Sequence, residues 1–283
     1  MQINLQNPDC YMESTKVLFI SQEITPYLPE SDMSVVCRNL PQGIQERGKE
    51  IRTFMPKFGC INERRNQLHE VIRLSGMNLI INDTDHPLII KVASIQSARM
   101  QVYFIDNDDY FGRKNTLIDE NGDTFPDNEE RSIFFNRGVL ETVRKLRWSP
   151  DLIHCHGWFT GLIPLLIKKA FKDDPLFVNS KVIYSVYNDD FTTALNKSIK
   201  QKILMEGIGK KDVALLDNTD FNSFSKLAIQ YSDGIIIANE NVNKPLQEHI
   251  ANSGKPFLPY NRMENYIDEY AQFYEKILSQ TNG

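Results

Sequence analysis

Glycine is scarce in this chain: only 14 of the 283 residues are glycine, below the ~7% that is usual in proteins. No Gly-x-Gly-x-x-Gly or Walker-type loop occurs, which argues against a dinucleotide oxidoreductase and a P-loop NTPase. No Gly-x-Ser-x-Gly elbow occurs either, which argues against an α/β-hydrolase.

The sequence also lacks the features of a secreted, membrane-bound or nucleic-acid-binding protein. Its four cysteines form no Cys-x-x-Cys pair, as is typical of reduced cytosolic thiols. No secretory signal begins the chain, and no apolar run approaches the ~18 residues of a membrane span. Lys and Arg number 32 against 37 Asp and Glu, so no basic surface is indicated. We expect a cytoplasmic protein that binds neither nucleic acid nor membrane.

Apolar runs alternate with amphipathic stretches along the chain. Runs typical of strands buried on both faces cover residues 16–21, 50–55, 101–106, 151–155, 181–186 and 233–238. Apolar residues at helical spacing predict helices at about 32–48, 126–146, 158–171, 221–231, 241–251 and 262–278. This alternation predicts an α/β fold with a Rossmann-like, doubly wound and mostly parallel sheet over residues 16–283, after a disordered or extended segment 1–15.

Three stretches make the pattern less regular. Pro41 interrupts the helix that Asp32 or Ser34 is expected to cap, which predicts a kink or a late start. Residues 78–81 and 88–94 predict two strands of a hairpin or an insertion. Residues 107–125 predict a turn-rich loop.

The most distinctive cluster is His-Cys-His-Gly-Trp-Phe-Thr-Gly, residues 154–161, at a predicted strand-to-helix turn. Ligands of parallel sheets bind outside the carboxyl ends of the strands, where this turn lies. We expect His154 and His156 to point to opposite faces, which places them poorly for one metal ion. One ring would contact a substrate hydroxyl or a developing charge, with Trp158 packed beneath it. The alternative is that backbone carbonyls occupy both rings.

A second cluster stands at the start of the helix near residue 126. Asp127 and Arg131, four residues apart, predict a solvated ion pair on one helix face, worth roughly a few tenths of a kcal/mol. Asn128 lies between them. The acidic strand end at residues 106–109 predicts a divalent-cation site or, as the alternative, a turn.

Five stretches resemble the bacterial glycogen synthases and plant starch synthases, which are retaining glucosyltransferases of the two-domain GT-B architecture. They are residues 16–26, residues 39–41 with 47–51 and 55–59, residues 102–107 with 110–111, residues 126–131, and residues 150–162. The resemblance runs from about Lys16 to Ile250. It implies a single GT-B N-terminal-type domain, and it implies the transfer of glucose from ADP-glucose to an α-1,4-glucan with no metal or other cofactor.

The same resemblance implies roles for individual residues. Asp127 corresponds to the acidic active-site residue of the family, and His156 to the histidine that contacts the transferred glucose. Both are expected to be catalytic. The expected substrate-binding residues are Asn128, Arg131, His154, Trp158 and Asn188.

The chain departs from the family pattern at the donor's phosphates. Residues 29–34 stand where the family has Lys-x-Gly-Gly, so Glu30 and Asp32 bring carboxylates that repel a diphosphate. Gly157 replaces an aspartate and Tyr187 a histidine. We expect the second GT-B domain to be absent, and a separate donor-binding glycosyltransferase domain to be a possible partner. The alternative is a non-catalytic glucan-binding or regulatory protein whose last helix closes the core.

Overall fold

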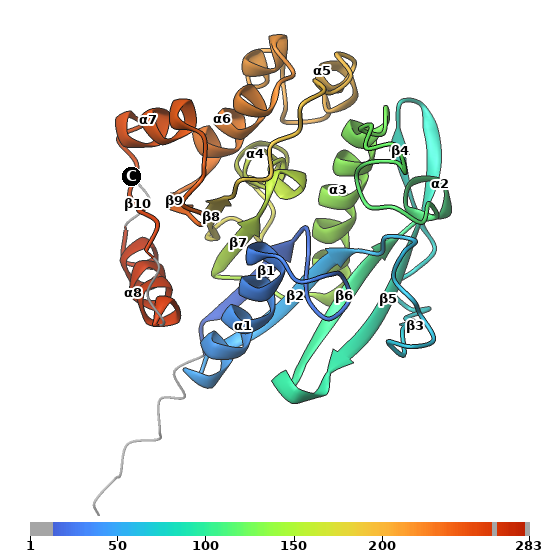
Figure 1. Ribbon diagram of the computed structural model, residues 1–283, viewed down its shortest axis with the longest axis horizontal. Coiled ribbons are helices and arrows are strands. Elements are labelled where there is room, and N and C mark those ends of the chain that lie inside the picture. The colour runs from blue at the N-terminus through green and yellow to red at the C-terminus, as the bar shows by residue number, and fades with distance from the viewer. Residues whose placement is uncertain (1–13, 262–264, 281–283) are drawn as a thin grey trace, which may run out of the picture.

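The computed structural model of the protein describes residues 14–261 and 265–280. In this part of the chain ten strands form one sheet in the order β10-β9-β8-β7-β1-β2-β6-β5-β3, and β4 pairs with β5 beside that path (Figure 1). The strands are β1 Lys16–Ser21, β2 Glu50–Pro56, β3 His69–Glu70, β4 Met77–Ile81, β5 Thr84–Ile95, β6 Met100–Asp106, β7 Leu152–His156, β8 Lys181–Val186, β9 Gly234–Ile237 and β10 Phe257–Leu258. Every pairing from β10 to β6 is parallel, so the predicted mostly parallel α/β sheet is confirmed.

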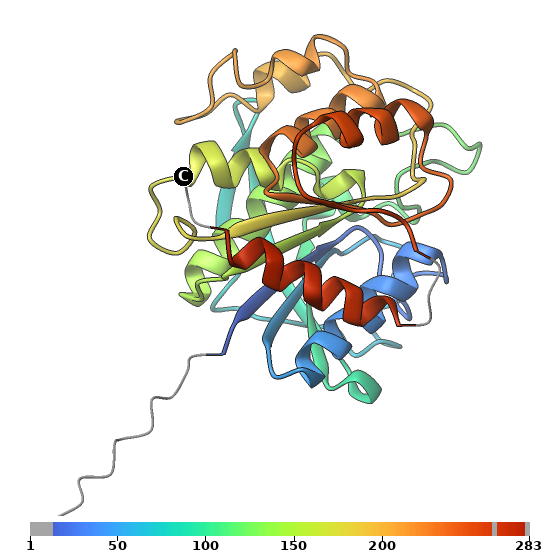
Figure 2. The same cartoon turned by 90° about the vertical axis from the view of Figure 1, so that its left-hand side faces the viewer.

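Helices cover both faces of the sheet (Figures 1 and 2). They are α1 Asp32–Glu46, α2 Asp108–Phe111, α3 Asn128–Leu146, α4 Ile163–Leu165, α5 Ile199–Lys202, α6 Phe221–Tyr231, α7 Lys244–Asn252 and α8 Tyr266–Leu278. On one face α1 and α8 lie side by side, joined by an ion pair between Arg47 and Asp268. On the opposite face lie α3, α4 and α6. The sheet is therefore doubly wound.

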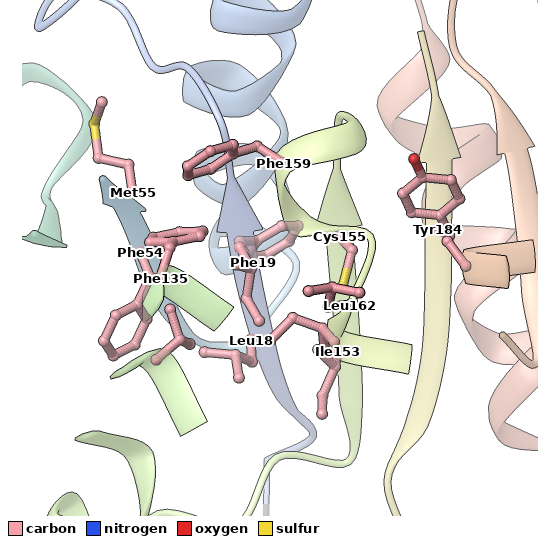
Figure 3. Packing of buried hydrophobic residues seen from close by; sticks show 14 of the residues in the cluster. Leu18, Phe19, Phe54, Met55, Phe135, Ile153, Cys155, Phe159, Leu162 and Tyr184 are labelled. Carbon is pink, nitrogen blue, oxygen red and sulfur yellow. The ribbon is translucent and has the colours of Figure 1, made fainter. Parts of the chain in front are cut away.

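The central strands carry the core. Leu18 of β1 and Ile153 of β7 are paired in register and fully buried, and Figure 3 shows them among the packed side chains. Burial of one such side chain stabilises the fold by about 1.5–3 kcal/mol. Because both faces of these strands are covered, their sequences are nearly continuous apolar runs. This is why they could be located from the sequence.

At the other edge of the sheet the predicted hairpin is confirmed. β4 and β5 pair antiparallel from Met77 opposite Leu88 to Ile81 opposite Thr84. Asn82 and Asp83 form the turn with φ angles of 52° and 59°, a left-handed conformation that suits two-residue hairpins and that asparagine and aspartate tolerate. β5 continues along β6 and makes this edge antiparallel.

The expected cap of the first helix, Asp32 or Ser34, was wrong, and of the two alternatives expected for Pro41 the late start is excluded. The cap is Ser31, whose hydroxyl accepts a hydrogen bond from the backbone N–H of Ser34 at 3.0 Å. The helix begins at Asp32 and continues through Pro41 to Glu46, so it has no late start. A proline inside a helix costs ~3 kcal/mol. The burial of Leu40, Pro41 and Ile44 against the sheet offsets that cost.

The single helix predicted over residues 158–171 is also wrong. The segment consists of a 3₁₀ turn Trp158–Thr160, the short α4, and a π-helical turn Leu166–Ala170. The π turn is closed by the N–H of Phe171, which donates to the carbonyl of Leu166 at 2.9 Å. Pro164 lacks an N–H and therefore stands in the first turn of α4, where none is needed.

Two further predictions concern the ends of elements. The loop at residues 107–125 contains α2, capped by Asn107, whose side chain accepts from the N–H of Tyr110 at 3.2 Å. The predicted start of the last helix, Arg262, lies outside the described residues, as does most of segment 1–15. α8 buries Tyr270, Phe273, Tyr274 and Ile277. Within residues 14–261 and 265–280, no helix is long and apolar enough to cross a membrane.

Candidate functional site

The carboxyl ends of β1, β7 and β8 lie next to one another and bring three polar segments together. The N–H of Gln22, after β1, donates to the carbonyl of His156 at 3.2 Å. The N–H of Gly157 donates to the carbonyl of Ser185 in β8 at 3.4 Å. Residues 21–24, 156–158 and 187–190 thus form one edge, where parallel sheets bind their ligands.

The two histidines of β7 point to the same face, so the expectation that they diverge was wrong. Side chains alternate along a strand, and residues i and i+2 therefore share a face. The ring centroids of His154 and His156 are 3.8 Å apart. Nδ1 of His154 lies 2.6 Å from the Tyr274 hydroxyl, and its Nε2 lies 2.7 Å from the Ser185 hydroxyl. Side chains, not backbone carbonyls, therefore occupy both nitrogens of His154.

His156 is fully buried, and one of its ring nitrogens has no hydrogen-bond partner among the described residues. Its Nδ1 lies 2.9 Å from the Tyr187 hydroxyl, and its Nε2 has no hydrogen-bond partner among the described residues. Burial lowers the pKa of His156 to about 3. Burial, and next the charge of His156, hold the pKa of His154 well below its usual range. Both imidazoles are therefore neutral near neutral pH, so His156 would act as a neutral hydrogen-bonding group and not as a proton-transfer base.

Asp127 is paired with a residue that the sequence did not indicate. Both of its carboxylate oxygens accept from the guanidinium of Arg113, at 2.7 and 2.5 Å. The predicted pair of Asp127 with Arg131 does not form. Arg113 comes from the loop before α3 and also lies over the Phe125 ring at 4.6 Å. No periodicity marks such a loop residue, so only its charge and its nearness in sequence could have suggested it.

Arg131 and Asn128 are fully buried and hold the preceding loop. Arg131 donates from Nε to the carbonyl of Tyr110 at 2.7 Å and from Nη1 to Asn128 at 2.6 Å. Asn128 in turn donates to the carbonyl of Leu117 at 2.8 Å. Burial lowers the pKa of Arg131 to about 10. These contacts fix the loop beside Asp127, and a direct role of either residue in substrate binding stays a prediction.

The remaining predicted site residues differ in their access to solvent. Trp158 is 2% exposed and packs edge-on against Phe191, with ring centroids 4.8 Å apart. Asn188 is exposed at the end of β8. Of the seven predicted side chains, Asn188 and the half-buried Asp127 are therefore the two that reach solvent at this edge.

A pocket with a volume of about 660 Å³ opens at this edge. It lies between the loop after β1 and the loop before α3, and its lining residues are Glu23, Tyr27, Leu28, Pro29, Glu30, Ser31, Cys60, Asn115, Thr116, Ile118 and Asp119. Three carboxylates and no lysine or arginine occur among these described residues. The Tyr27 side chain is 7% exposed, and its hydroxyl has no partner in the described structure. Sequence reasoning missed Tyr27, which no motif distinguishes.

The N-terminus of α1 borders this pocket and is unfavourable to anions. The capping box of Ser31 and Ser34 satisfies the backbone N–H groups of these two residues. The Ser31 hydroxyl also donates to Glu23 at 2.8 Å, and Asp32 stands in the first turn. A helix N-terminus attracts phosphate through free N–H groups and its dipole. Here serine oxygens and carboxylates occupy that place.

Asp106, in the acidic strand end at residues 106–109, belongs to an ion-pair network. Asp106 accepts from Lys91 at 2.8 Å, and Lys91 also contacts Glu63 at 2.8 Å. Glu63 forms a second ion pair with Lys57, at 2.6 Å. In the part of the chain that the structure describes, no group of three His, Cys, Asp or Glu residues is close enough to hold a metal ion.

A doubly wound α/β sheet with its polar loops and pocket at the carboxyl edge places this protein among the Rossmann-like domains. Within that class, residues 16–255 match the sequence model of the starch synthase catalytic domain, and the chain belongs to this family.

Two glycogen synthases illustrate the similarity of this chain to individual proteins. A glycogen synthase of Chlorobium limicola is 38% identical over 206 residues, which are 72% of this chain and 42% of that protein. A glycogen synthase of Chlorobaculum tepidum is 39% identical over 174 residues, which are 61% of this chain and 36% of that protein. The chain thus spans less than half the length of these curated relatives.

A solved structure shares the fold. The catalytic domain of starch synthase IV from Arabidopsis thaliana, bound to ADP and acarbose, superposes with a TM-score of 0.69 at 17% identity. The superposition covers 87% of this chain and 51% of that one. The described residues therefore have the fold of about one half of that catalytic domain.

Proposed function

We propose that this chain is the acceptor-side domain of a glycogen or starch synthase-type glycosyltransferase, which transfers glucose from ADP-glucose to an α-1,4-glucan with retention. The family match over residues 16–255 carries this proposal. The starch synthase structure with the same fold was solved with ADP and acarbose. In the proposed reaction Asp127 faces the developing positive charge of the sugar, and His156 contacts the transferred glucose.

The chemistry of the 660 Å³ pocket supports an uncharged sugar as its ligand. Sugar hydroxyls donate hydrogen bonds, and the carboxylates of Glu23, Glu30 and Asp119 can accept them. The Tyr27 hydroxyl has no partner and would gain one from a sugar oxygen. A diphosphate would instead be repelled by three carboxylates. The pocket therefore fits an α-glucan chain and not the phosphates of ADP-glucose.

Because carboxylates surround the N-terminus of α1, we propose that a second domain or chain supplies the positive groups for the diphosphate. Departure of a nucleoside diphosphate requires positive or hydrogen-bonding groups aimed at the leaving oxygens. Ser31, Asp32 and Glu30 surround the place that would provide them. The proposed partner is a donor-binding glycosyltransferase domain.

A second candidate function is a glucan-binding protein without catalytic activity. Arg113 favours it, because this residue engages both oxygens of Asp127. An aspartate held in this way stabilises a developing cation less well, because the guanidinium already balances its charge.

Transfer of labelled glucose from ADP-glucose to glycogen distinguishes the two functions. The assay uses this chain alone, the chain mixed with the donor-side half of the Chlorobium limicola glycogen synthase, and the same mixture with Asp127→Asn. The proposal expects incorporation in the mixture, a decrease of at least 10²-fold with Asp127→Asn, and little incorporation by the chain alone. Glycogen binding without incorporation in any mixture would favour the non-catalytic protein. Absence of both would overturn both functions.

A further inference from the structure

The turn after β7 is built around Gly157. Its φ angle is +84°, in the left-handed region that favours glycine. A Cβ atom at this position would lie 2.8 Å from Met33 Cε and 3.0 Å from both Gln22 Oε1 and Asp189 Oδ2. Side chains from α1 and from the ends of β1 and β8 therefore fill the space that a side chain of residue 157 would take.

Two of these side chains cap the turn from neighbouring strands. The N–H of Trp158 donates to Asp189 Oδ2 at 2.8 Å, and the N–H of Phe159 donates to Gln22 Oε1 at 3.1 Å. The first N–H groups of a helical turn are normally met by the side chain of the residue that precedes it. Gly157 has no side chain, and residues 31 positions away in sequence or more provide the acceptors.

The end of β8 therefore holds the turn on both sides of Gly157. Tyr187 and Asp189 are two residues apart, and they reach the His156 ring and the Trp158 N–H respectively. We infer that Asp189 is a positioning residue of the candidate site, whose ionised carboxylate caps the turn after β7 and so fixes His156 and Trp158 at the edge of the sheet. This inference concerns the geometry of the turn and does not require that the domain binds glucan.

The surroundings of Asp189 make this cap sensitive to its charge. The charged groups that act on it are Asp190, its neighbour in sequence, and Glu23 from the loop after β1. Burial first, and then charges that include that of Asp189, hold the pKa values of Tyr184 and Tyr187 well above their usual range. Burial first, and then the two acidic neighbours, raise the pKa of Asp189 to about 7 against the pull of the Trp158 N–H. Near neutral pH the cap therefore changes from a charge-assisted hydrogen bond to a weaker neutral one.

The test is a pH titration of the Trp158 backbone amide. The chain has two tryptophans, Trp148 and Trp158, so ¹⁵N-tryptophan labelling gives two backbone amide signals, which Trp148→Phe assigns. The intact protein is titrated from pH 5.5 to 8.5, together with Asp189→Asn and the matched control Asp190→Asn. Asp189→Asn keeps an oxygen acceptor and the side-chain shape, so the fold should be retained.

We expect the Trp158 signal to shift with a midpoint near pH 7 in the parent. In Asp190→Asn the signal should still titrate, but with a lower midpoint, because the charge of Asp190 raises the pKa of Asp189. The Trp148 signal should stay still. In Asp189→Asn the titration of Trp158 should be lost. A titration unchanged by Asp189→Asn, or a parent signal that does not move over this pH range, would overturn the inference. Neither result depends on glucose transfer. The inference can therefore fail while the proposed function stands, and the proposed function can fail while the inference stands.

Discussion

The buried histidine pair makes the stability of this protein depend on pH, and the effect can be worked out. His154 and His156 are fully buried, and burial lowers the pKa of both below the value of ~6.5 that they have when unfolded. The unfolded chain therefore binds protons that the folded chain refuses. The contribution of His156 to stability is complete above pH ~6.5 and is lost as the pH falls from there towards its folded pKa of about 3.

The size of the loss follows from the same linkage. Between pH 7 and pH 5 an unfolded histidine takes up most of one proton while the folded one stays neutral, which costs about 2 kcal/mol per histidine. Asp189 acts in the opposite direction, because its raised pKa makes the folded state take up a proton as the pH falls. The comparison must therefore be made between parent and variant.

The variant is His156→Gln, which removes the titrating ring and keeps an acceptor for the Tyr187 hydroxyl. Urea unfolding at pH 7 and pH 5 gives the two free energies of unfolding for each protein. The loss on acidification should be about 2 kcal/mol smaller in His156→Gln than in the parent. His69→Gln, at an exposed position of β3, is the control and should behave as the parent does. Equal losses in His156→Gln and the parent would refute the reasoning.

Three further predictions follow from the site. Gly157→Ala should lower the free energy of unfolding by about 2–4 kcal/mol, and Gly254→Ala by only about 1 kcal/mol. Both glycines have a positive φ, but only Gly157 has neighbouring atoms where a Cβ would lie. Equal losses in urea unfolding would count against the packed turn. Arg113→Ala should destabilise the fold by no more than about 1 kcal/mol, because the ion pair with Asp127 is partly exposed. The same variant should be cleaved faster by a protease within residues 112–125. An unchanged cleavage rate would show that other contacts hold this loop. Tyr27→Phe should leave the free energy of unfolding within about 0.5 kcal/mol of the parent, because the hydroxyl has no partner. The same variant should be retarded less by glycogen in a native gel. Full retardation would remove Tyr27 from the proposed glucan site.

The sheet could be predicted from the sequence because its central strands are buried on both faces. Runs such as Lys16–Ser21 and Lys181–Val186 are strands at the predicted positions. The edge that carries the candidate site followed from the same argument, since loops after parallel strands meet at one edge. Segments with mixed signals were harder. Residues 158–171 are mostly apolar, and hydrophobicity alone does not reveal that a 3₁₀ turn, a short α-helix and a π turn divide them.

The contacts of the candidate site could not be predicted, because they join residues far apart in sequence. Asp127 was expected to pair within its own helix and pairs instead with Arg113 from the preceding loop. His154 was expected to face a cleft or a backbone carbonyl and is held by Tyr274 of the last helix, 120 residues away. Such partners depend on how the helices pack on the sheet, and local spacing in the sequence carries no record of that.

Electrophoresis in a native gel that contains glycogen tests the central claim most directly, because the proposed acceptor-side role requires that the isolated chain bind an α-glucan. The mobility of the chain is compared in gels with and without glycogen, with maltooligosaccharide or ADP as competitors. The account predicts retardation by glycogen that maltooligosaccharide relieves and ADP does not, because the pocket carries three carboxylates and no lysine or arginine among its described lining residues. Identical mobility in the two gels would contradict it.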